Sequence, residues 1–180
     1  ANTGYIGGYV STLLKTTNGG QTWTPLTING GYVYDIVFPQ NANTGYVSAI
    51  DGSQDYIYKT TNGGLNWVQV LYLEDAFIQS MSFPLDDQTG YVANYATYTQ
   101  PGGVWKTTDG GATWNFMTQG ITSVPVAIDF PVDTQSGLAV GFSGAIIKTT
   151  DGGITWSEGS LAVSNTMEDV VLLNNNVGYA

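Results

Sequence analysis

The sequence contains no cysteine, no histidine and no arginine among its 180 residues. It therefore has no disulfide, no thiolate nucleophile, no histidine base and no zinc site of the usual ligand type. Charged residues make up 10% of the chain, against about 25% in ordinary soluble domains. The net charge of -10 argues against nucleic acids and anionic membranes as partners, because both require a basic surface. No apolar run approaches the ~20 residues of a membrane span, so no membrane insertion is expected.

With so few charges, the exterior must consist mainly of Thr, Asn, Ser, Gln, Gly and Tyr. Such a surface suits an extracellular or self-associating protein better than a cytosolic one. Hydrophobic residues at 42% and aromatic residues at 13% still indicate a folded core despite 24 glycines. We therefore expect a folded domain that is secreted or displayed on the cell surface.

Four gapless repeats dominate the chain. Each reads Lys-Thr-Thr, then Asn or Asp, then Gly-Gly, and ends in Trp, and the copies start at Lys15, Lys59, Lys106 and Lys148. Gly-Tyr or Gly-Leu pairs and Phe-Pro pairs recur with the same rhythm. A period of roughly 40 to 50 residues is that of a four-stranded propeller blade. Apolar first strands are predicted at 34–38, 78–83, 126–130 and 168–173.

The predicted fold is an all-β propeller with four-stranded antiparallel blades. The second strand begins at the Gly-Tyr motif, the third ends in Lys-Thr-Thr, and the Trp opens the fourth. Asn-Gly and Asp-Gly tolerate the backbone angles of tight hairpins, which places a hairpin between the third and fourth strands. The chain is expected to form one domain, residues 1–180. Its repeats are approximately 1–31, 32–75, 76–122 and 123–163, with 164–180 completing the first blade or a neighbouring subunit's blade.

These hairpins carry a family resemblance. Residues 107–114, Thr-Thr-Asp-Gly-Gly-Ala-Thr-Trp, resemble the Asp-box, or bacterial neuraminidase repeat. The longer unit resembles the photosystem II assembly-factor-like propellers, whose repeats also occur in secreted bacterial surface proteins. Because the motif recurs in every blade, its residues are interpreted as scaffold rather than as one active site. The structural Asp-box positions are Thr16, Asn18, Gly20, Trp23, Thr60, Asn62, Gly64, Trp67, Thr107, Asp109, Gly111, Trp114, Thr149, Asp151, Gly153 and Trp156.

The resemblance also permits two tests of activity. Sialidases hold the carboxylate of their substrate with an arginine cluster, and a chain without arginine cannot build that clamp. Photosystem assembly factors carry an arginine-rich patch that this chain lacks as well. The acidic pairs at 74–75, 86–87 and 168–169 are sequence neighbours in or beside turns, which indicates solvated charge rather than an acid and base facing a bond. No catalytic residue is predicted, and the chain is expected not to be an enzyme.

Two loops are the candidate ligand sites. Asp51, Ser53 and Asp55 alternate in a way that offers oxygen ligands to Ca²⁺, although a solvated turn is the favoured interpretation and no other cofactor is expected. Tyr95, Tyr98 and Trp105 belong to an aromatic insertion suited to stacking on sugars or anchoring a protein, with ordinary strand packing as the alternative. The four lysines are expected to be solvent-facing tips.

Three arrangements of the chain remain open, ranked as a fragment of a larger propeller, a closed four-blade ring and a strand-exchanged polymer. The favoured function is a non-enzymatic extracellular binding or structural module with a protein or glycan partner. The alternatives are a fibre or filament subunit that associates with itself by exchanging its C-terminal strand, and a glycan-active enzyme other than a sialidase.

Overall fold

The computed structural model describes residues 2–95, 101–131, 133–160 and 164–180. These residues form five antiparallel sheets, and the three central sheets have four strands each. The prediction of an all-β chain built from four-stranded antiparallel units is confirmed. Among the described residues the helical structure is a single 3-10 turn, Phe142–Gly144, and no helix is long and apolar enough to span a membrane.

We call the sheets blades 1 to 5 in chain order, and each strand pairs with the next along the chain. Blade 1 has β1 (Gly4–Gly7), β2 (Leu13–Thr16) and β3 (Thr24–Pro25). Blade 2 has β4 (Tyr32–Val37), β5 (Gly45–Asp51), β6 (Gln54–Thr60) and β7 (Val68–Glu74). Blade 3 has β8 (Ile78–Ser82), β9 (Gly90–Asn94), β10 (Gly103–Thr107) and β11 (Asn115–Met117). Blade 4 has β12 (Pro125–Asp129), β13 (Gly137–Gly141), β14 (Ala145–Thr149) and β15 (Ser157–Ser160), and blade 5 has β16 (Val171–Asn174) and β17 (Val177–Tyr179).

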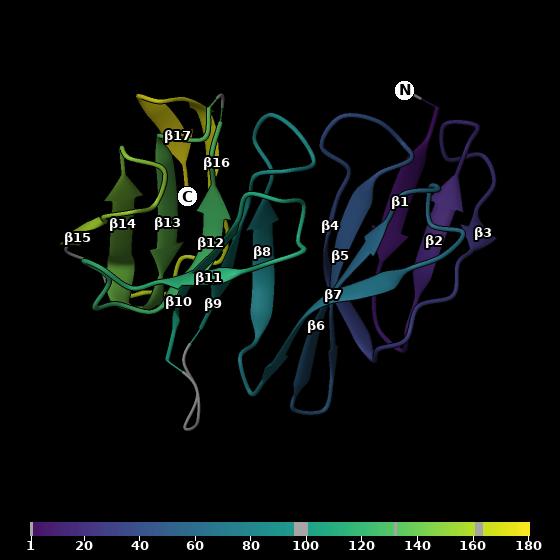
Figure 1. Ribbon diagram of the computed structural model, residues 1–180, viewed down its shortest axis with the longest axis horizontal. Helices are drawn as coiled ribbons and strands as arrows, with labels where there is room; N and C mark the ends of the chain where they lie inside the picture. Colours follow the sequence, from purple (N-terminus) through teal and green to yellow (C-terminus); the bar gives the residue numbers. More distant parts are fainter. Residues whose placement is uncertain (1, 96–100, 132, 161–163) are drawn as a thin grey trace.

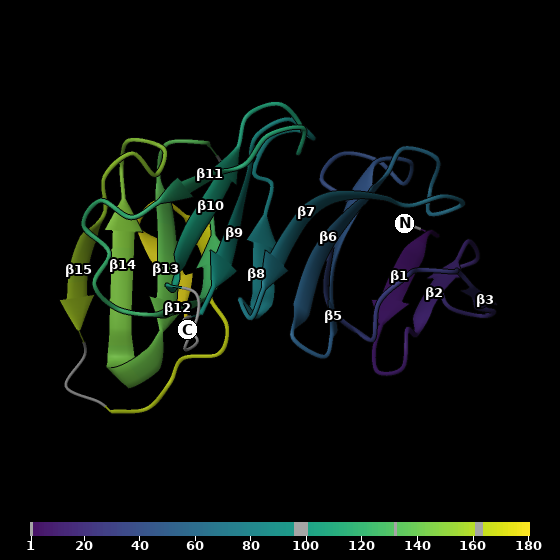
Figure 2. The ribbon, with the colours of Figure 1, turned by 60° about the horizontal axis from the view of Figure 1, so that its bottom comes forward.

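The blades stand side by side as an incomplete propeller. Figures 1 and 2 show blade 1 at one end of the arrangement and blades 4 and 5 at the other, with the two chain ends well separated. The first strands β4, β8 and β12 are neighbours in space, and β1 lies against β4. In every blade that has a fourth strand, that strand begins one residue after the Trp, not at the Trp itself.

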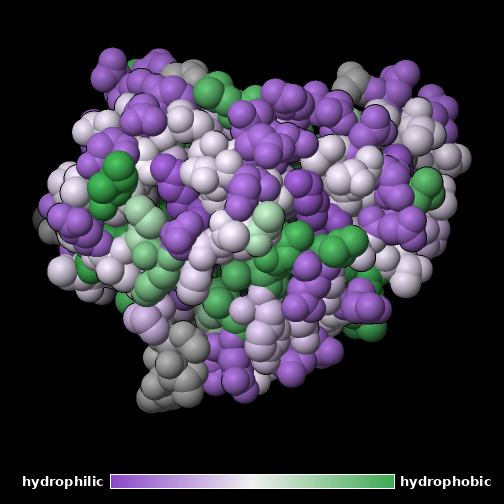
Figure 3. All heavy atoms as spheres, viewed as in Figure 1, coloured by the Kyte–Doolittle hydropathy of each residue, from purple (hydrophilic) through white to green (hydrophobic). Residues whose placement is uncertain are grey.

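The core consists of layers between blades. One apolar cluster joins blades 1 and 2, a second joins blades 2 and 3, a third joins blades 3 and 4, and a small one joins blades 4 and 5. Each blade therefore buries its apolar faces only against its neighbours, as repeat architectures do. Figure 3 shows hydrophobic residues gathered near the middle of one face of the molecule, with mostly hydrophilic residues around its rim.

The C-terminal segment does not join blade 1 in this structure. β16 pairs with β17, and among the described residues β1 pairs with β2 alone. Closure of a four-blade ring within one chain, the second of the three expected arrangements, is therefore not the arrangement seen. A local hairpin has a low loop-closure cost, and Asn174 Oδ1 stabilises its turn by accepting hydrogen bonds from the amides of Asn176 and Val177.

Candidate functional site

The Asp-box hairpins have one geometry in all four copies. In blade 3, Thr107 Oγ1 donates to Asp109 Oδ1 at 2.8 Å and accepts from the amide of Gly111 at 2.9 Å. Asp109 also accepts from the amide and hydroxyl of Thr113. The two glycines have positive φ, about 69° for Gly110 and 88° for Gly111, where a side chain would be strained. These contacts lie within the hairpin, which places the motif in the scaffold.

The residue after Lys-Thr-Thr is Asn in blades 1 and 2 and Asp in blades 3 and 4. Only the Asp hairpins contain a group that titrates in acid. Asp109 and Asp151 are held by hydrogen bonds from Thr113 and Thr155, and these lower the pKa of each carboxyl to about 2. The Asn18 amide occupies the same place, with Oδ1 accepting from Thr16 and Thr22. The second hydrogen bond is reversed, because Asn18 Nδ2 donates to Thr22 Oγ1 where Asp109 Oδ2 accepts from the Thr113 hydroxyl. Asparagine therefore holds the hairpin without titrating.

We expect this difference to be visible in acid. A carboxyl whose folded pKa is depressed stabilises the fold above its unfolded pKa of 3.8, and that stability is lost as the pH falls towards 2. The double variant Asp109→Asn, Asp151→Asn should lose less stability between pH 4 and pH 2 than the natural chain. Thermal unfolding at a series of pH values measures this. Parallel curves for the two proteins would contradict it.

The lysines are not the solvent-facing tips expected from the sequence, except for Lys148. The Nζ atoms of Lys15, Lys59 and Lys106 donate to the carbonyl oxygens of Gly63, Gly110 and Gly152 at 2.9, 2.8 and 2.7 Å. Each of these glycines lies in the Asp-box of the following blade. The lysine therefore fastens its own blade to the next one.

A tyrosine beside each of Lys15, Lys59 and Lys106 repeats the same connection. The hydroxyl of Tyr46 donates to the carbonyl oxygens of Asp87 and Gly110, both in or beside blade 3, and its ring stacks on Phe83 at 4.0 Å. Lys59 lies 5.4 Å from the centroid of the Tyr46 ring. The ring of Phe83 in turn meets Trp114 edge-on. We call this arrangement the blade interface. It has a Tyr-Lys half on one blade and a Phe-Trp-Gly half on the next.

The predicted Ca²⁺ loop is divided by the fold. Asp51 ends β5, whereas the buried Asp55 side chain accepts from the amides of Ala76 and Ile78. Both oxygens of Asp55 are thus occupied by main-chain amides of the link between β7 and β8. The described residues contain no group of three or more acidic side chains placed to hold a metal ion. Ca²⁺ binding remains a prediction from the sequence.

The predicted aromatic insertion is also divided. Trp105 packs as a strand residue, with Nε1 donating to Asn94 and its ring against Phe116. Tyr95 instead stacks on Phe77 at 4.6 Å and meets Phe142 edge-on at 5.8 Å. Tyr98 lies outside the described residues. Trp105 and Tyr95 therefore belong to two different environments.

Tyr95 is one member of a larger aromatic surface that sequence reasoning missed. This surface lies at the end of the blades where the hairpins between second and third strands are found, at the bottom of Figure 1 and turned forward in Figure 2. Its members come from four blades and are far apart in the sequence, so no local pattern reveals them. We call it the loop face and define it by Tyr9, Tyr32, Tyr34, Phe77, Tyr95 and Phe142.

A groove of about 230 Å³ lies within the loop face, lined by Gly8, Tyr9, Tyr32, Val33 and Tyr34. The rings of Tyr9 and Tyr32 meet edge-on at 4.8 Å. Tyr34 occupies a β-bulge between Val33 and Asp35, a device that redirects a side chain from its normal alternation. Three exposed phenols thus gather at one open groove.

The charged side chains near the loop face are acidic. Burial raises the pKa of the Tyr95 phenol, and Tyr34 and the Asp55 carboxyl raise it further. All four lysines lie near the third-strand ends beside the Asp-boxes, at the opposite end of the blades. No lysine is therefore placed to attract an anionic ligand to the groove.

Other acidic side chains accept hydrogen bonds from main-chain amides. Asp35 Oδ2 accepts from the amide of Met81 and Asp129 Oδ2 from the amide of Leu172, each at 2.7 Å, so that one first strand is fastened to the next. Burial raises the pKa of Asp35, while the amides of Met81 and Ile36 oppose that rise. Glu158 accepts from Thr122 and Ser123. These carboxylates have structural partners and do not face one another across an open cleft.

Comparison with known proteins agrees with this geometry. The family model described as photosynthesis system II assembly factor YCF48 matches residues 1–119, and that of the BNR/Asp-box repeat matches residues 147–158. No curated protein matches the chain.

Solved structures with the same fold include an ancestral GH74 enzyme (TM-score 0.72, 22% identity, 87% of this chain and 22% of the other). They also include YCF48 bound to D1 peptide (TM-score 0.61, 20% identity, 94% of this chain and 46% of the other). A third is YCF48 from Cyanidioschyzon merolae (TM-score 0.66, 17% identity, 95% of this chain and 56% of the other). This chain thus spans about a fifth to a little over half of their lengths, and at these identities the likeness shows the fold alone. By its match over residues 1–119, the chain belongs to the family of the photosynthesis system II assembly factor YCF48.

Proposed function

We propose that this chain is a non-enzymatic binding module that holds an extended polypeptide segment in the groove of the loop face. The observation that carries the proposal is the open groove at Tyr9, Tyr32 and Tyr34. Tyrosine rings supply large contact area at low entropic cost, and aromatic-lined grooves suit extended segments such as polyproline II helices. Secretion or display on the cell surface is part of the same proposal, as expected from the composition.

The charge distribution supports a neutral or basic partner. Three of the four lysines are committed to glycine carbonyls between blades, and the chain carries a net charge of -10. An anionic segment would meet repulsion, whereas a basic one would be drawn in. The structural neighbour described as YCF48 bound to D1 peptide gives a precedent for peptide binding by this fold.

The test is binding to a phage-displayed peptide library, followed by titration of the selected peptides. We expect Tyr34→Ala to weaken binding by about tenfold or more, because a central aromatic anchor is worth over about 1 kcal/mol. The matched control is Tyr72→Ala on β7, since the two side chains are similarly exposed, 45% for Tyr34 and 43% for Tyr72. Selected peptides that bind both variants equally would contradict the assignment of the groove.

A glycan is the second candidate, favoured by the likeness to a GH74 enzyme and by aromatic rings that suit sugar stacking. Another structural neighbour is described as the GH74 xyloglucanase from Xanthomonas campestris. An array that includes xyloglucan oligosaccharides therefore separates the two candidates. Glycan binding lost in Tyr34→Ala, with no peptide selected, would replace the polypeptide proposal. Release of reducing ends from xyloglucan would favour the enzyme instead.

A further inference from the structure

Three Asn-Gly pairs occur in the chain, and their asparagines are Asn18, Asn29 and Asn62. In such a pair the main-chain nitrogen of the glycine can attack the side-chain carbonyl carbon of the asparagine, because glycine has no side chain to hinder the approach. The reacting groups are the same in all three pairs. The fold therefore decides which of them can react.

The Asp-box restrains both reacting groups of its Asn-Gly pair. In blade 2 the amide of Gly63 donates to the Asn43 carbonyl at 2.8 Å. Asn62 Oδ1 accepts from the Thr60 hydroxyl and the Asn66 amide, each at 3.0 Å. The hairpin of blade 1 has the equivalent contacts at both positions. The glycine N–H is thus engaged and the asparagine side chain is fixed across the turn, so neither group is free to meet the other.

Asn29, in the link between β3 and β4, has neither restraint. Its side chain is exposed and forms no hydrogen bond with the part of the chain that the structure describes. The Gly30 amide donates to no described residue either, although the Gly30 carbonyl accepts from the Ser11 hydroxyl. Gly30 has a φ of 147°, where any other residue would be strained. The backbone of this link therefore requires the glycine that makes the pair reactive.

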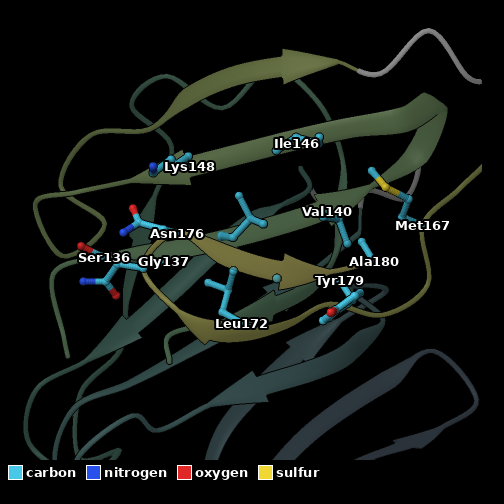
Figure 4. A pocket seen from close by; sticks show the side chains of 13 residues that line it. Ser136, Gly137, Val140, Ile146, Lys148, Met167, Leu172, Asn176, Tyr179 and Ala180 are labelled. Atoms are coloured by element: carbon cyan, nitrogen blue, oxygen red, sulfur yellow. The ribbon is translucent and has the colours of Figure 1, made fainter. Parts of the chain in front are cut away.

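Exposure alone does not make an asparagine reactive. Asn176 is also exposed, and it lines a cavity of about 340 Å³ between blades 4 and 5 (Figure 4). The next residue is Val177, whose branched side chain crowds its amide and whose N–H donates to Asn174 Oδ1 at 3.0 Å. Asn176 is therefore an internal comparison for Asn29.

We propose that Asn29 is a site of spontaneous deamidation. The Gly30 nitrogen loses its proton and forms a bond to Asn29 Cγ, while the bond from Cγ to the side-chain nitrogen breaks. That nitrogen leaves as ammonia with the displaced proton, and a succinimide ring remains. Water then opens the ring at Cγ to give aspartate, or at the main-chain carbonyl carbon to give isoaspartate. Both products carry a new carboxylate, and isoaspartate also places the side-chain methylene in the backbone.

The link around this site has little room for a longer backbone. Ile28 is 6% exposed and belongs to the apolar cluster between blades 1 and 2. A Cβ at Gly31 would lie 2.6 Å from the Ile50 carbonyl oxygen. The Gly31 carbonyl accepts from the Ser11 amide at 2.5 Å, which fastens the hairpin between β1 and β2 to blade 2. Isoaspartate at position 29 should therefore loosen this contact between the blades.

Incubation of the folded natural chain at mildly alkaline pH, followed by peptide mapping with mass spectrometry, tests the proposal. Conversion should be at least about tenfold faster at Asn29 than at Asn18 and Asn62, because the two Asp-box hairpins must first open. In urea the three asparagines should react at comparable rates, because the hairpins are then lost. Asn176 should remain unmodified over the same time in both conditions.

Two variants separate the effect of the new charge from that of the longer backbone. Asn29→Gln should not convert over the same time, because ring closure through its longer side chain is slower. Freshly purified Asn29→Asp carries the carboxylate on a backbone of normal length. Hydrogen exchange at the Ser11 amide should become faster in the aged natural chain, but not in aged Asn29→Gln or in fresh Asn29→Asp.

Each other outcome overturns the proposal. Equal rates at Asn29 and Asn62 in the folded chain would show that the Asp-box gives no protection. Conversion of Asn29 in urea alone would show that the link itself prevents the reaction. A preference for Asn29 that is as strong in urea as in the folded chain would assign it to the neighbouring sequence. Unchanged exchange at Ser11 after conversion would show that the link absorbs the longer backbone.

Discussion

The variant Gly90→Ala is expected to lower the free energy of unfolding by about 2–3 kcal/mol, which is typical of overpacking in a well-filled core. A Cβ at position 90 would lie 2.3 Å from Phe83 Cε1. Phe83 cannot retreat, because Tyr46 stacks on its ring and Trp114 meets it edge-on. The substitution should therefore destabilise the interface between blades 2 and 3 as well as the strand that carries the glycine.

The control for this prediction is the same substitution at an equivalent position. Gly4 starts the corresponding strand of blade 1, but its added Cβ would be in ordinary contact, 3.4 Å from Thr16. Urea unfolding of Gly4→Ala at low protein concentration should match the natural chain within about 0.5 kcal/mol. Equal losses from the two variants would show that the Phe-Gly contact does not set the stability.

The second large effect is expected at Asp55. Its buried carboxylate accepts from the amides of Ala76 and Ile78, and it holds a link in which Asp75 and Phe77 both have positive φ. Asp55→Ala would leave buried donors without an acceptor, at a cost of about 2–4 kcal/mol. Urea unfolding measures the loss, and hydrogen exchange should show faster exchange at Ala76 and Ile78 than at Val104.

The pH dependence of Asp55 has the opposite sign to that of the Asp-box. Burial raises the pKa of Asp55 above 3.8, against the amides of Ala76 and Ile78 that lower it. The folded chain then binds this proton more readily than the unfolded chain, so the contribution of Asp55 to stability grows as the pH falls through its folded pKa. Asp55→Asn should remove that trend. An unchanged pH profile in Asp55→Asn would contradict it.

The repeat pattern predicted the fold well because the signals are local. Each Asp-box hairpin forms from contacts within about ten residues, as Thr107, Asp109 and Thr113 show. The alternation of apolar residues and turns then gives strands within a few residues of their observed bounds. The pairing of the chain end was not predictable in the same way, because β1 and β17 both carry the Gly-Tyr pair that opens a second strand.

Most contacts of the candidate site could not be predicted from the sequence. In the sequence, Lys59 is an ordinary polar residue at the end of a strand. Its hydrogen bond from Nζ to the Gly110 carbonyl depends on how blade 3 packs against blade 2, which no local pattern predicts. Tyr34, Phe142 and the stacked pair Phe77 and Tyr95 belong to three different repeats, and they come together only when the blades pack side by side. Sequence reasoning selected Tyr95 because it stands in an unusual insertion, and it missed the others because each looks like an ordinary strand or turn residue.

The uniform blade interface has a consequence for how such a chain changes length in evolution. Since each interface from blade 1 to blade 4 takes its tyrosine and lysine from one repeat and its phenylalanine, tryptophan and glycine from the next, duplicating one such period reproduces both halves in the right order. A single unequal recombination between repeats would add or remove a whole blade without requiring any compensating mutation in the contacts. Repeat number is therefore free to vary by genetic accident, while the chemistry of each junction stays constant.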